Sequence, residues 1–229
     1  MKDTPLIEAQ IELYRRSFLQ HGDSPQSTFN ARRELQWLRF ERLVQPLLGL
    51  ASRFSIHDVG AGLCDLHAYL RERGVEHDYS ATEIVPEMIE HARRKYPDIV
   101  VERRDLLLDP PSERYDFVVS SGMFNLPGQV PREDWRRFCF AMLERMFAMA
   151  SQAIAVNFLT SHRTFTDPTL FYLDPGEALE FCQARLSRFV AIDHSYPLYE
   201  YTVVVLRPER VAAAHPGEAF GKYLRQDPG

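Results

Sequence analysis

The chain has 229 residues and a formal net charge of -5, and 45% of its residues are hydrophobic. This length suits one α/β domain with an additional segment. Because the charge is negative and no long basic run exists, we expect neither nucleic acid nor a membrane as a partner. The three cysteines form no closely spaced pair, and no window approaches the roughly 18 apolar residues of a membrane span. We therefore expect a cytoplasmic protein with reduced cysteines.

Two amphipathic helices are predicted before the first strand. Apolar residues recur at helical spacing over residues 6–19 and again over residues 30–48, with a glycine and a proline between them. Such helices either cap the open edge of a ligand crevice or merely cover the sheet, and the sequence leaves both alternatives open. The expected organisation has three parts: a helical cap at residues 1–50, an α/β domain at residues 51–208 and a tail at residues 209–229.

The most informative stretch is a glycine turn between a predicted strand and a predicted helix, within Phe54–Leu66. Gly60 and Gly62 allow the backbone to bend sharply and to approach a bulky ligand. A dinucleotide site would have a third glycine where this chain has Asp65, and an acid there would repel a pyrophosphate. The acid at Asp58, just before the turn, favours a ligand that carries positive charge instead.

The next three predicted strands also end in polar or small residues. Glu83 ends the second strand, where an acid can accept hydrogen bonds from the hydroxyls of a ribose. Asp105 lies at the end of the third strand, which is predicted at residues 99–106. The fourth strand is the nearly continuous apolar run that a buried parallel strand requires. It ends in a short polar stretch: Ser120, Ser121 and Gly122.

These motifs resemble those of class I methyltransferases that use S-adenosylmethionine (SAM). Asp58, Gly60 and Gly62 match the family's first motif, Asp/Glu-x-Gly-x-Gly-x-Gly, although Cys64 stands at its third glycine. Glu83 to Pro97 is similar to the second motif. The resemblance implies SAM as cofactor and a site composed of Asp58, Gly60, Ala61, Gly62, Glu83, Ile84, Met88, Asp105, Leu106, Ser120, Ser121 and Gly122.

The resemblance also implies what these residues do and how the chain folds. In the family the acid at Glu83 binds the ribose, Ile84 packs on the adenine, and Asp105 accepts a hydrogen bond from the adenine amino group. We expect an α/β, doubly wound, Rossmann-like sheet of seven strands with an antiparallel last strand. The short link between the last two predicted strands, at residues 189–194 and 201–206, independently favours an antiparallel pair there.

The residues that would perform catalysis are harder to identify. Methyl transfer mainly requires positioning of the acceptor and, for some acceptors, removal of a proton. His162 and His194 are the leading candidates for a general base because both are predicted near loops or turns at strand ends. Asn125, just beyond the fourth strand, could orient an acceptor or cap the turn before Pro127. This chemistry needs no metal ion, and no cluster with metal-ligand spacing is evident.

The sequence thus predicts a SAM-dependent methyltransferase that modifies an oxygen or nitrogen of a small molecule. The acidic charge, and the lack of an Asn/Asp-Pro-Pro-Tyr pattern after the fourth strand, disfavour DNA and protein-glutamine acceptors. We expect the cap and the loop at residues 160–174 to select the acceptor. Two alternatives stay open: a SAM-binding protein without turnover and a nicotinamide-dependent oxidoreductase. The sequence specifies neither the acceptor nor the oligomeric state.

Overall fold

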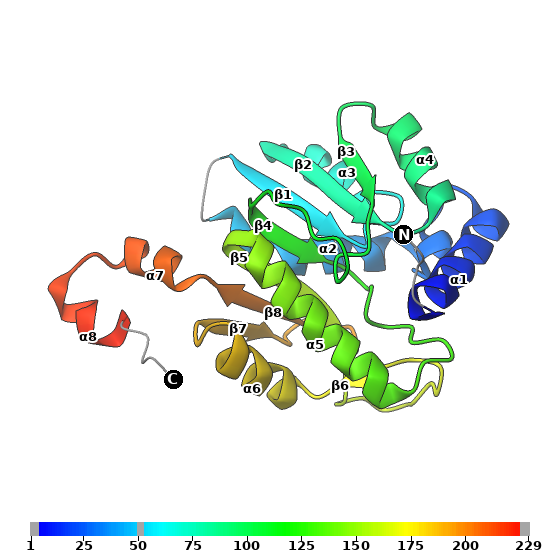
Figure 1. Cartoon of the computed structure of the whole chain (residues 1–229). Helices are drawn as coiled ribbons and strands as arrows, with labels where there is room; N and C mark the ends of the chain where they lie inside the picture. Colours follow the sequence, from blue (N-terminus) through cyan, green and yellow to red (C-terminus); the bar gives the residue numbers. More distant parts are fainter. Residues whose placement is uncertain (1–4, 50–52, 225–229) are drawn as a thin grey trace.

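An eight-stranded sheet with helices on both faces forms the body of the protein (Figure 1). The computed structural model describes residues 5–49 and 53–224. The strands are β1 (Phe54–Val59), β2 (His77–Glu83), β3 (Val100–Arg103), β4 (Tyr115–Ser120), β5 (Ala150–Thr160), β6 (Tyr172–Leu173), β7 (Val190–Asp193) and β8 (Glu200–Leu206). The helices are α1 (Pro5–His21), the 3-10 helix η1 (Pro25–Thr28), α2 (Arg33–Leu48), α3 (Asp65–Glu72), α4 (Pro86–Lys95), α5 (Arg132–Met149), α6 (Pro175–Arg185), α7 (Pro208–Ala214), the 3-10 helix η2 (Glu218–Phe220) and α8 (Gly221–Leu224).

The topology confirms the predicted doubly wound, Rossmann-like sheet. The strands follow the order β3-β2-β1-β4-β5-β8-β7, in which β1 to β5 are parallel and β8 is antiparallel to both neighbours. The additional strand is β6, a two-residue strand that pairs with the end of β5, where Leu159 lies opposite Tyr172. The strand order reverses between β1 and β4. Sheets of this kind bind ligands beside such a reversal, at the carboxyl ends of the strands.

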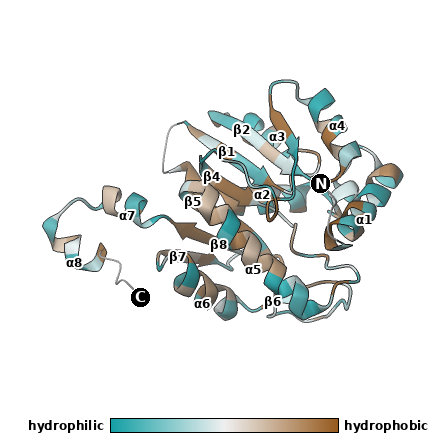
Figure 2. Ribbon diagram, viewed as in Figure 1, coloured by the Kyte–Doolittle hydropathy of each residue, from teal (hydrophilic) through white to brown (hydrophobic). Residues whose placement is uncertain are grey.

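Side chains of the central strands alternate between two hydrophobic cores. Val118, Ile154 and Val203 face α5 and α6, whereas Val119 and Ala155 face α2, α3 and α4. Both faces are buried, which explains why the sequence of these strands is almost continuously apolar. Figure 2 shows the same distribution, with hydrophobic residues concentrated in β4 and β8 and hydrophilic residues over α4.

Three boundaries differ from the expected ones or lie outside the described residues. β3 ends at Arg103, so Asp105 lies in the turn that follows the strand. The C-terminal tail forms α7, η2 and α8, which bury no residue and extend away from the sheet in Figure 1. The predicted boundary between cap and domain, at residues 50 and 51, lies outside the described residues, as does the end of the tail at residues 225–229.

The cap, which consists of α1, η1 and α2, contacts the body at several places. α1 lies beside α4 at the edge of the sheet (Figure 1), where Arg15 Nε is 2.6 Å from Glu87 Oε1. Gln10 Nε2 donates a hydrogen bond to the Leu126 carbonyl oxygen at 3.1 Å, which ties α1 to the loop after β4. α2 packs on the sheet itself, against β5 and β8. α1 and η1 therefore lie across the carboxyl edge of the sheet, whereas α2 belongs to the layer of helices that packs on one face of the sheet.

Candidate active site

A cavity of about 110 Å³ lies at the carboxyl ends of β1, β2 and β4, beneath α1 and η1. The structure brings most of the predicted cofactor residues together around it. The predicted residues that line the cavity are Asp58, Gly60, Ala61, Gly62, Glu83, Ile84, Asp105, Leu106, Ser121 and Gly122. They come from four separate segments of the chain, which meet only because the parallel strands end at the same edge.

The glycine turn needs its glycines for both conformation and space. Gly60 and Gly62 have φ angles of 68° and 56°, in the left-handed region that other residues avoid. A Cβ atom on Gly62 would lie 2.7 Å from Cγ2 of Thr28 in the cap. One on Gly60 would lie 2.9 Å from the sulfur of Met123. The turn can therefore contact the cap closely only because it has no side chains there.

Cys64 shows how the chain departs from the family motif without changing the turn. It stands at the motif's third glycine and still adopts a left-handed conformation, with a φ angle of 58°. Its side chain is fully buried. A non-glycine residue in this conformation costs roughly 1–2 kcal/mol. Cys64 therefore adopts a backbone conformation that glycine usually takes, at the cost of local strain.

Glu83 joins the glycine turn to the start of α4 through three backbone hydrogen bonds. Gly62 N donates to Oε2 at 2.7 Å, while Ile84 N and Val85 N donate to Oε1 at 2.7 and 3.0 Å. Burial raises the pKa of Glu83, and these three bonds oppose that rise. A carboxylate offers about four acceptor sites, so three backbone donors leave capacity for a further donor from a ligand.

Asp58 is a buried acid on the floor of the cavity. The Tyr79 hydroxyl donates a hydrogen bond to its Oδ2 at 2.8 Å. Burial raises the pKa of Asp58 to about 7, with smaller contributions from the negative charges of Glu83 and Asp65. Asp58 is therefore poised to change its protonation near neutral pH, and a nearby cation would favour its ionised form.

The polar residues after β3 and β4 hold the loops of the site in place. Asp105 Oδ1 accepts a hydrogen bond from Leu107 N at 3.0 Å. Asn157 on β5 was not predicted to belong to the site, yet its Oδ1 accepts from Gly122 N at 2.8 Å. Asn157 is also buried, which is costly for an amide without partners. A single buried amide inside the apolar run of β5 was the signal that would have identified it.

Two of the predicted cofactor residues do not line the cavity. Ser120 is buried and donates its hydroxyl to the Val59 carbonyl oxygen at 2.8 Å, which joins β4 to the end of β1. Met88 lies in the first turn of α4 and is fully buried in a small cluster with Leu63 and Val85. In this structure both residues support the backbone of the site.

The three candidate catalytic residues also lie outside the residues that line the cavity. The carbonyl oxygen of Asn125 accepts a hydrogen bond from Phe171 N at 2.9 Å, and its side-chain Oδ1 is buried with no partner among the described residues. His162 is exposed, with Nε2 at 3.7 Å from Asp174 Oδ2, and the ring of His194 is 6.2 Å away. The structure brings the two histidines together but not to the cavity, so their catalytic roles stay predictions.

The cap supplies cavity residues that the motifs did not reveal. Three of them, Ile7, Gln10 and Tyr14, follow helical spacing along one face of α1. This periodicity was visible in the sequence, but it did not distinguish a cavity wall from a core face. The other lining residues without a predicted role are Thr28, Asn30, Gln36, Phe40, Val59, Leu63, Asp65, Thr82, Arg104, Met123, Trp135, Phe138 and Met142. The cap thus closes the crevice in addition to covering the sheet.

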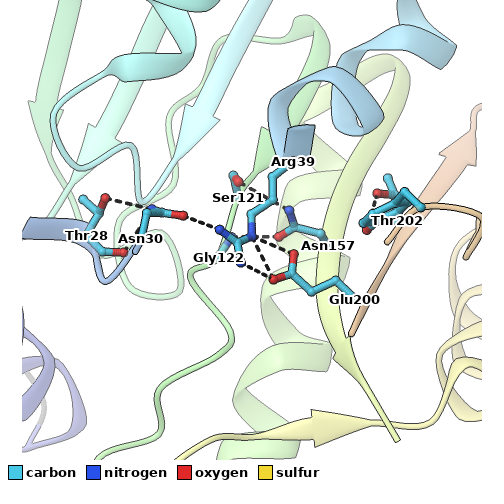
Figure 3. A network of polar contacts seen from close by, with 9 residues as sticks. Thr28, Asn30, Arg39, Ser121, Gly122, Asn157, Glu200 and Thr202 are labelled. Carbon is cyan, nitrogen blue, oxygen red and sulfur yellow. Dashed lines mark hydrogen bonds and ion pairs between the residues drawn. The ribbon is translucent and has the colours of Figure 1, made fainter. Parts of the chain in front are cut away.

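A polar network continues from the cavity wall to β8 (Figure 3). The Asn30 side chain donates to Thr28 Oγ1 at 3.0 Å and accepts from the guanidinium of Arg39. Both carboxylate oxygens of Glu200 accept from Arg39 Nε at 2.8 Å, and only 2% of the Glu200 side chain is exposed. The network therefore anchors the segment between η1 and α2 to the start of β8 through a buried ion pair.

Comparisons with known proteins identify the family. A family model described as "Methyltransferase domain" matches residues 56–147. A Mycobacterium tuberculosis protein named "Putative methyltransferase Rv1506c" is 31% identical over 162 residues. The match covers 69% of this chain and 96% of that protein. The chain belongs to the class I SAM-dependent methyltransferases. SAM is its cofactor and it is an enzyme, in agreement with the first of the functions that the sequence left open.

Solved structures show the same fold at low sequence identity. The magnesium protoporphyrin IX methyltransferase from Synechocystis PCC 6803, with bound S-adenosylhomocysteine (SAH), superposes with a TM-score of 0.62 at 15% identity, covering 86% of this chain and 94% of that one. The DhpI-SAM-HEP complex gives a TM-score of 0.61 at 17% identity, covering 90% of this chain and all of the other (100%). These likenesses confirm the fold of the methyltransferase family.

The cavity suits SAM chemically. The glycine turn exposes backbone without side chains, and Glu83 retains acceptor capacity for ribose hydroxyls. Asp58 lines the cavity as an acid whose ionised form would be favoured by the cationic sulfonium and ammonium groups of such a ligand. Within residues 5–49 and 53–224, no group of three or more histidine, cysteine, aspartate or glutamate side chains is placed to hold a metal ion. No helix in the same ranges is long and apolar enough to cross a membrane.

Proposed function

We propose that this methyltransferase transfers the methyl group of SAM to an oxygen or nitrogen of a small-molecule acceptor. The observation that carries the proposal is the closure of the cavity by the cap. Gln10, Tyr14 and Asn30 extend over the carboxyl edge from one side, while Trp135 and Phe138 of α5 bound it from another. An enclosed site of this kind admits a small compound far more readily than a polymer.

The lining of the cavity supports an acceptor that is largely uncharged. The side chains that the cap contributes are apolar, aromatic, amide or hydroxyl groups, and none of them carries a formal charge. The charged lining residues lie on the body, next to the strands that carry the cofactor motifs: Asp58, Asp65, Glu83, Arg104 and Asp105. A neutral acceptor would therefore meet matching surface on the cap side, whereas an anionic one would face the repulsion of buried acids.

The residues of this chain would act mainly by binding and positioning. SAM supplies an electrophilic methyl group on a sulfonium, so the leaving group is already activated. Glu83 would hold the ribose, and the Gly60–Gly62 turn would admit the amino-acid part close to the backbone. The cap would exclude water and hold the acceptor against the body, which is how fixed orientation accelerates such a displacement. Among the solved structures, the magnesium protoporphyrin IX methyltransferase is likewise named for a small-molecule acceptor.

A transfer assay tests the proposal. The purified protein is incubated with SAM that carries a labelled methyl group and with a panel of phenols, aromatic amines and carboxylic acids, alongside duplex DNA and a mixed protein substrate. We expect label and SAH to appear only with small molecules, and Glu83→Gln to lower both. Label found only in DNA or protein would refute the small-molecule acceptor. A parallel titration with NADH, for which we expect no binding, controls for general nucleotide affinity.

A further inference from the structure

Tyr14 of the cap occupies a position that neither the motifs nor the family comparison assigns to the cofactor. It lies on α1, lines the cavity and is partly buried. Its ring meets the ring of Phe29 edge to face at 5.3 Å between centroids, which restricts its orientation. It also packs, with Ile84, against the small cluster of Leu63, Val85 and Met88. Ile84 is the residue expected to contact adenine, so Tyr14 borders the nucleoside end of the site.

The docking of α1 fixes which of its residues reach the cavity. Gln10 is held by the loop after β4, and Arg15 is held by Glu87 of α4. α1 therefore spans the carboxyl edge from the loop after β4 to α4, and Figure 1 shows it beside α4. Ile7, Gln10 and Tyr14 share the face that lines the cavity, while Arg15 lies off that face and outside the lining set. Tyr14 is the aromatic residue that α1 contributes to this lining.

The hydroxyl group of Tyr14 stays protonated in this position. Burial is the larger cause that raises the pKa of Tyr14, and the negative charge of Glu83 raises it further. A phenol of this kind donates hydrogen bonds and does not act as a base near neutral pH. Glu83 already accepts three backbone hydrogen bonds and retains capacity for about one more donor. Tyr14 thus brings a hydrogen-bond donor to the wall of the cavity that Glu83 also lines, close enough to Glu83 for the charge of that carboxylate to act on it.

We propose that Tyr14 is a cofactor-binding residue contributed by the cap, which covers the adenosine part of SAM opposite Glu83 and Ile84. The inference rests on the same cofactor site as the proposed function. It assigns α1 a direct part in cofactor binding, in addition to any part in selecting the acceptor. It also predicts that the cap responds to the cofactor before any acceptor binds.

Calorimetric titration with SAH and with 5′-methylthioadenosine tests this inference. The second ligand lacks the amino-acid part, so it reports the nucleoside end alone. We expect Tyr14→Ala to weaken the binding of both ligands by the same factor, about tenfold or more, since it removes the ring and the hydroxyl. Tyr14→Phe should weaken both by about 3- to 10-fold, the cost of one hydrogen bond.

Arg15→Ala is the matched control, because it loosens the attachment of α1 to α4 without altering the cavity lining. We expect it to change both affinities by less than about twofold, as an exposed ion pair contributes little. The inference is overturned if Tyr14→Ala binds both ligands like the wild type, or if Arg15→Ala weakens them as much as Tyr14→Ala does. A wild type that binds neither ligand would refute the cofactor site and the proposed function as well.

Discussion

The two sides of the cavity are built by different means. On the body, the Gly60–Gly62 turn and Glu83 are fixed by backbone geometry and by backbone hydrogen bonds over short distances. On the cap, Asn30 and Thr28 are tied to the body through Arg39, whose partner Glu200 lies at the start of β8. The body side is therefore held by backbone groups of the strand ends and turns, whereas the position of the cap side depends on contacts between side chains of distant segments.

Sequence motifs are informative about the body side of the cavity and much less so about the cap side. A tight turn restricts which residues can stand at each position, so its pattern identifies its function. A helix that is held by an ion pair and a few packing contacts places no comparable restriction on its own sequence. Four sets of variants test whether the two sides of the cavity are held in these different ways.

The buried ion pair between Arg39 and Glu200 should be the costliest to break. We expect Arg39→Ala to lower the free energy of unfolding by about 3–5 kcal/mol, because it leaves the Glu200 carboxylate buried without its partner. The control is Arg33→Ala, which breaks the exposed pair with Glu72 on the same helix and should cost less than about 1 kcal/mol. Urea denaturation measures both. Equal costs for the two variants would show that the cap is not anchored at Arg39.

The contact between Gly62 and Thr28 should couple the two sides directly. Gly62→Ala should destabilise the protein by about 1–3 kcal/mol, since it combines an unfavourable φ angle with a close approach to Thr28 Cγ2. Thr28→Ser removes that methyl group but keeps the hydroxyl that Asn30 contacts. In this background Gly62→Ala should cost measurably less. If the destabilisations caused by the two substitutions, measured by thermal unfolding, are strictly additive, the turn and the cap are not in close contact.

The pKa of Asp58 predicts opposite effects of pH on stability and on SAM binding. The folded pKa of about 7 lies above the ordinary pKa of an aspartate, 3.8, so this acid stabilises the fold below pH 3.8 and loses that contribution as pH rises through about 7. Asp58→Asn should therefore gain stability relative to the wild type between pH 5 and 8. The ionised Asp58 carboxylate attracts cationic SAM, so the affinity of the wild-type protein for SAM should increase about 3- to 10-fold from pH 6 to 8.

The Asp58→Asn variant is also the control for the affinity measurement. It cannot ionise, so its affinity for SAM should stay nearly constant over this pH range. A wild-type affinity that does not depend on pH, or a variant that keeps the full pH dependence, would assign the ionisation to another group.

The smallest effects are expected at the two exposed histidines. Because His162 and His194 do not line the cavity, we expect His162→Ala and His194→Ala to keep kcat/KM within about twofold of the wild type once an acceptor is known. Initial rates at saturating SAM measure this. A loss of tenfold or more in either variant would identify that histidine as the general base and would place the acceptor at the loop after β5.

Much of the body was predictable from the sequence, and the reasons are physical. The apolar run of β4 has few alternatives to a buried parallel strand, and the paired glycines of the turn imply left-handed backbone. Less local features were predicted less well. Asp105 was expected in the site and lines the cavity, but it lies beyond the end of β3, because a strand boundary depends on pairing with a neighbour. Asn157 joined the site only because β5 lies next to β4.

The cap marks the limit of what the sequence could predict. Its helices were expected from their periodicity, and the spacing of Ile7, Gln10 and Tyr14 was visible from the start. The same spacing fits a core face, so it could not show that these residues line a cavity. The cluster of His162 and His194 illustrates the converse, since both histidines lie near strand ends but neither is among the residues that line this cavity.

Hydrogen exchange with and without SAH tests most directly whether the cofactor site is shared between body and cap. Amide exchange is followed by mass spectrometry in the wild-type protein, at saturating SAH and without an acceptor. We predict slower exchange in the body at residues 60–64 and 83–88 and also in the cap at residues 7–17 and 25–30. Protection confined to the body would contradict the account, because it would mean that SAH binds without engaging the cap.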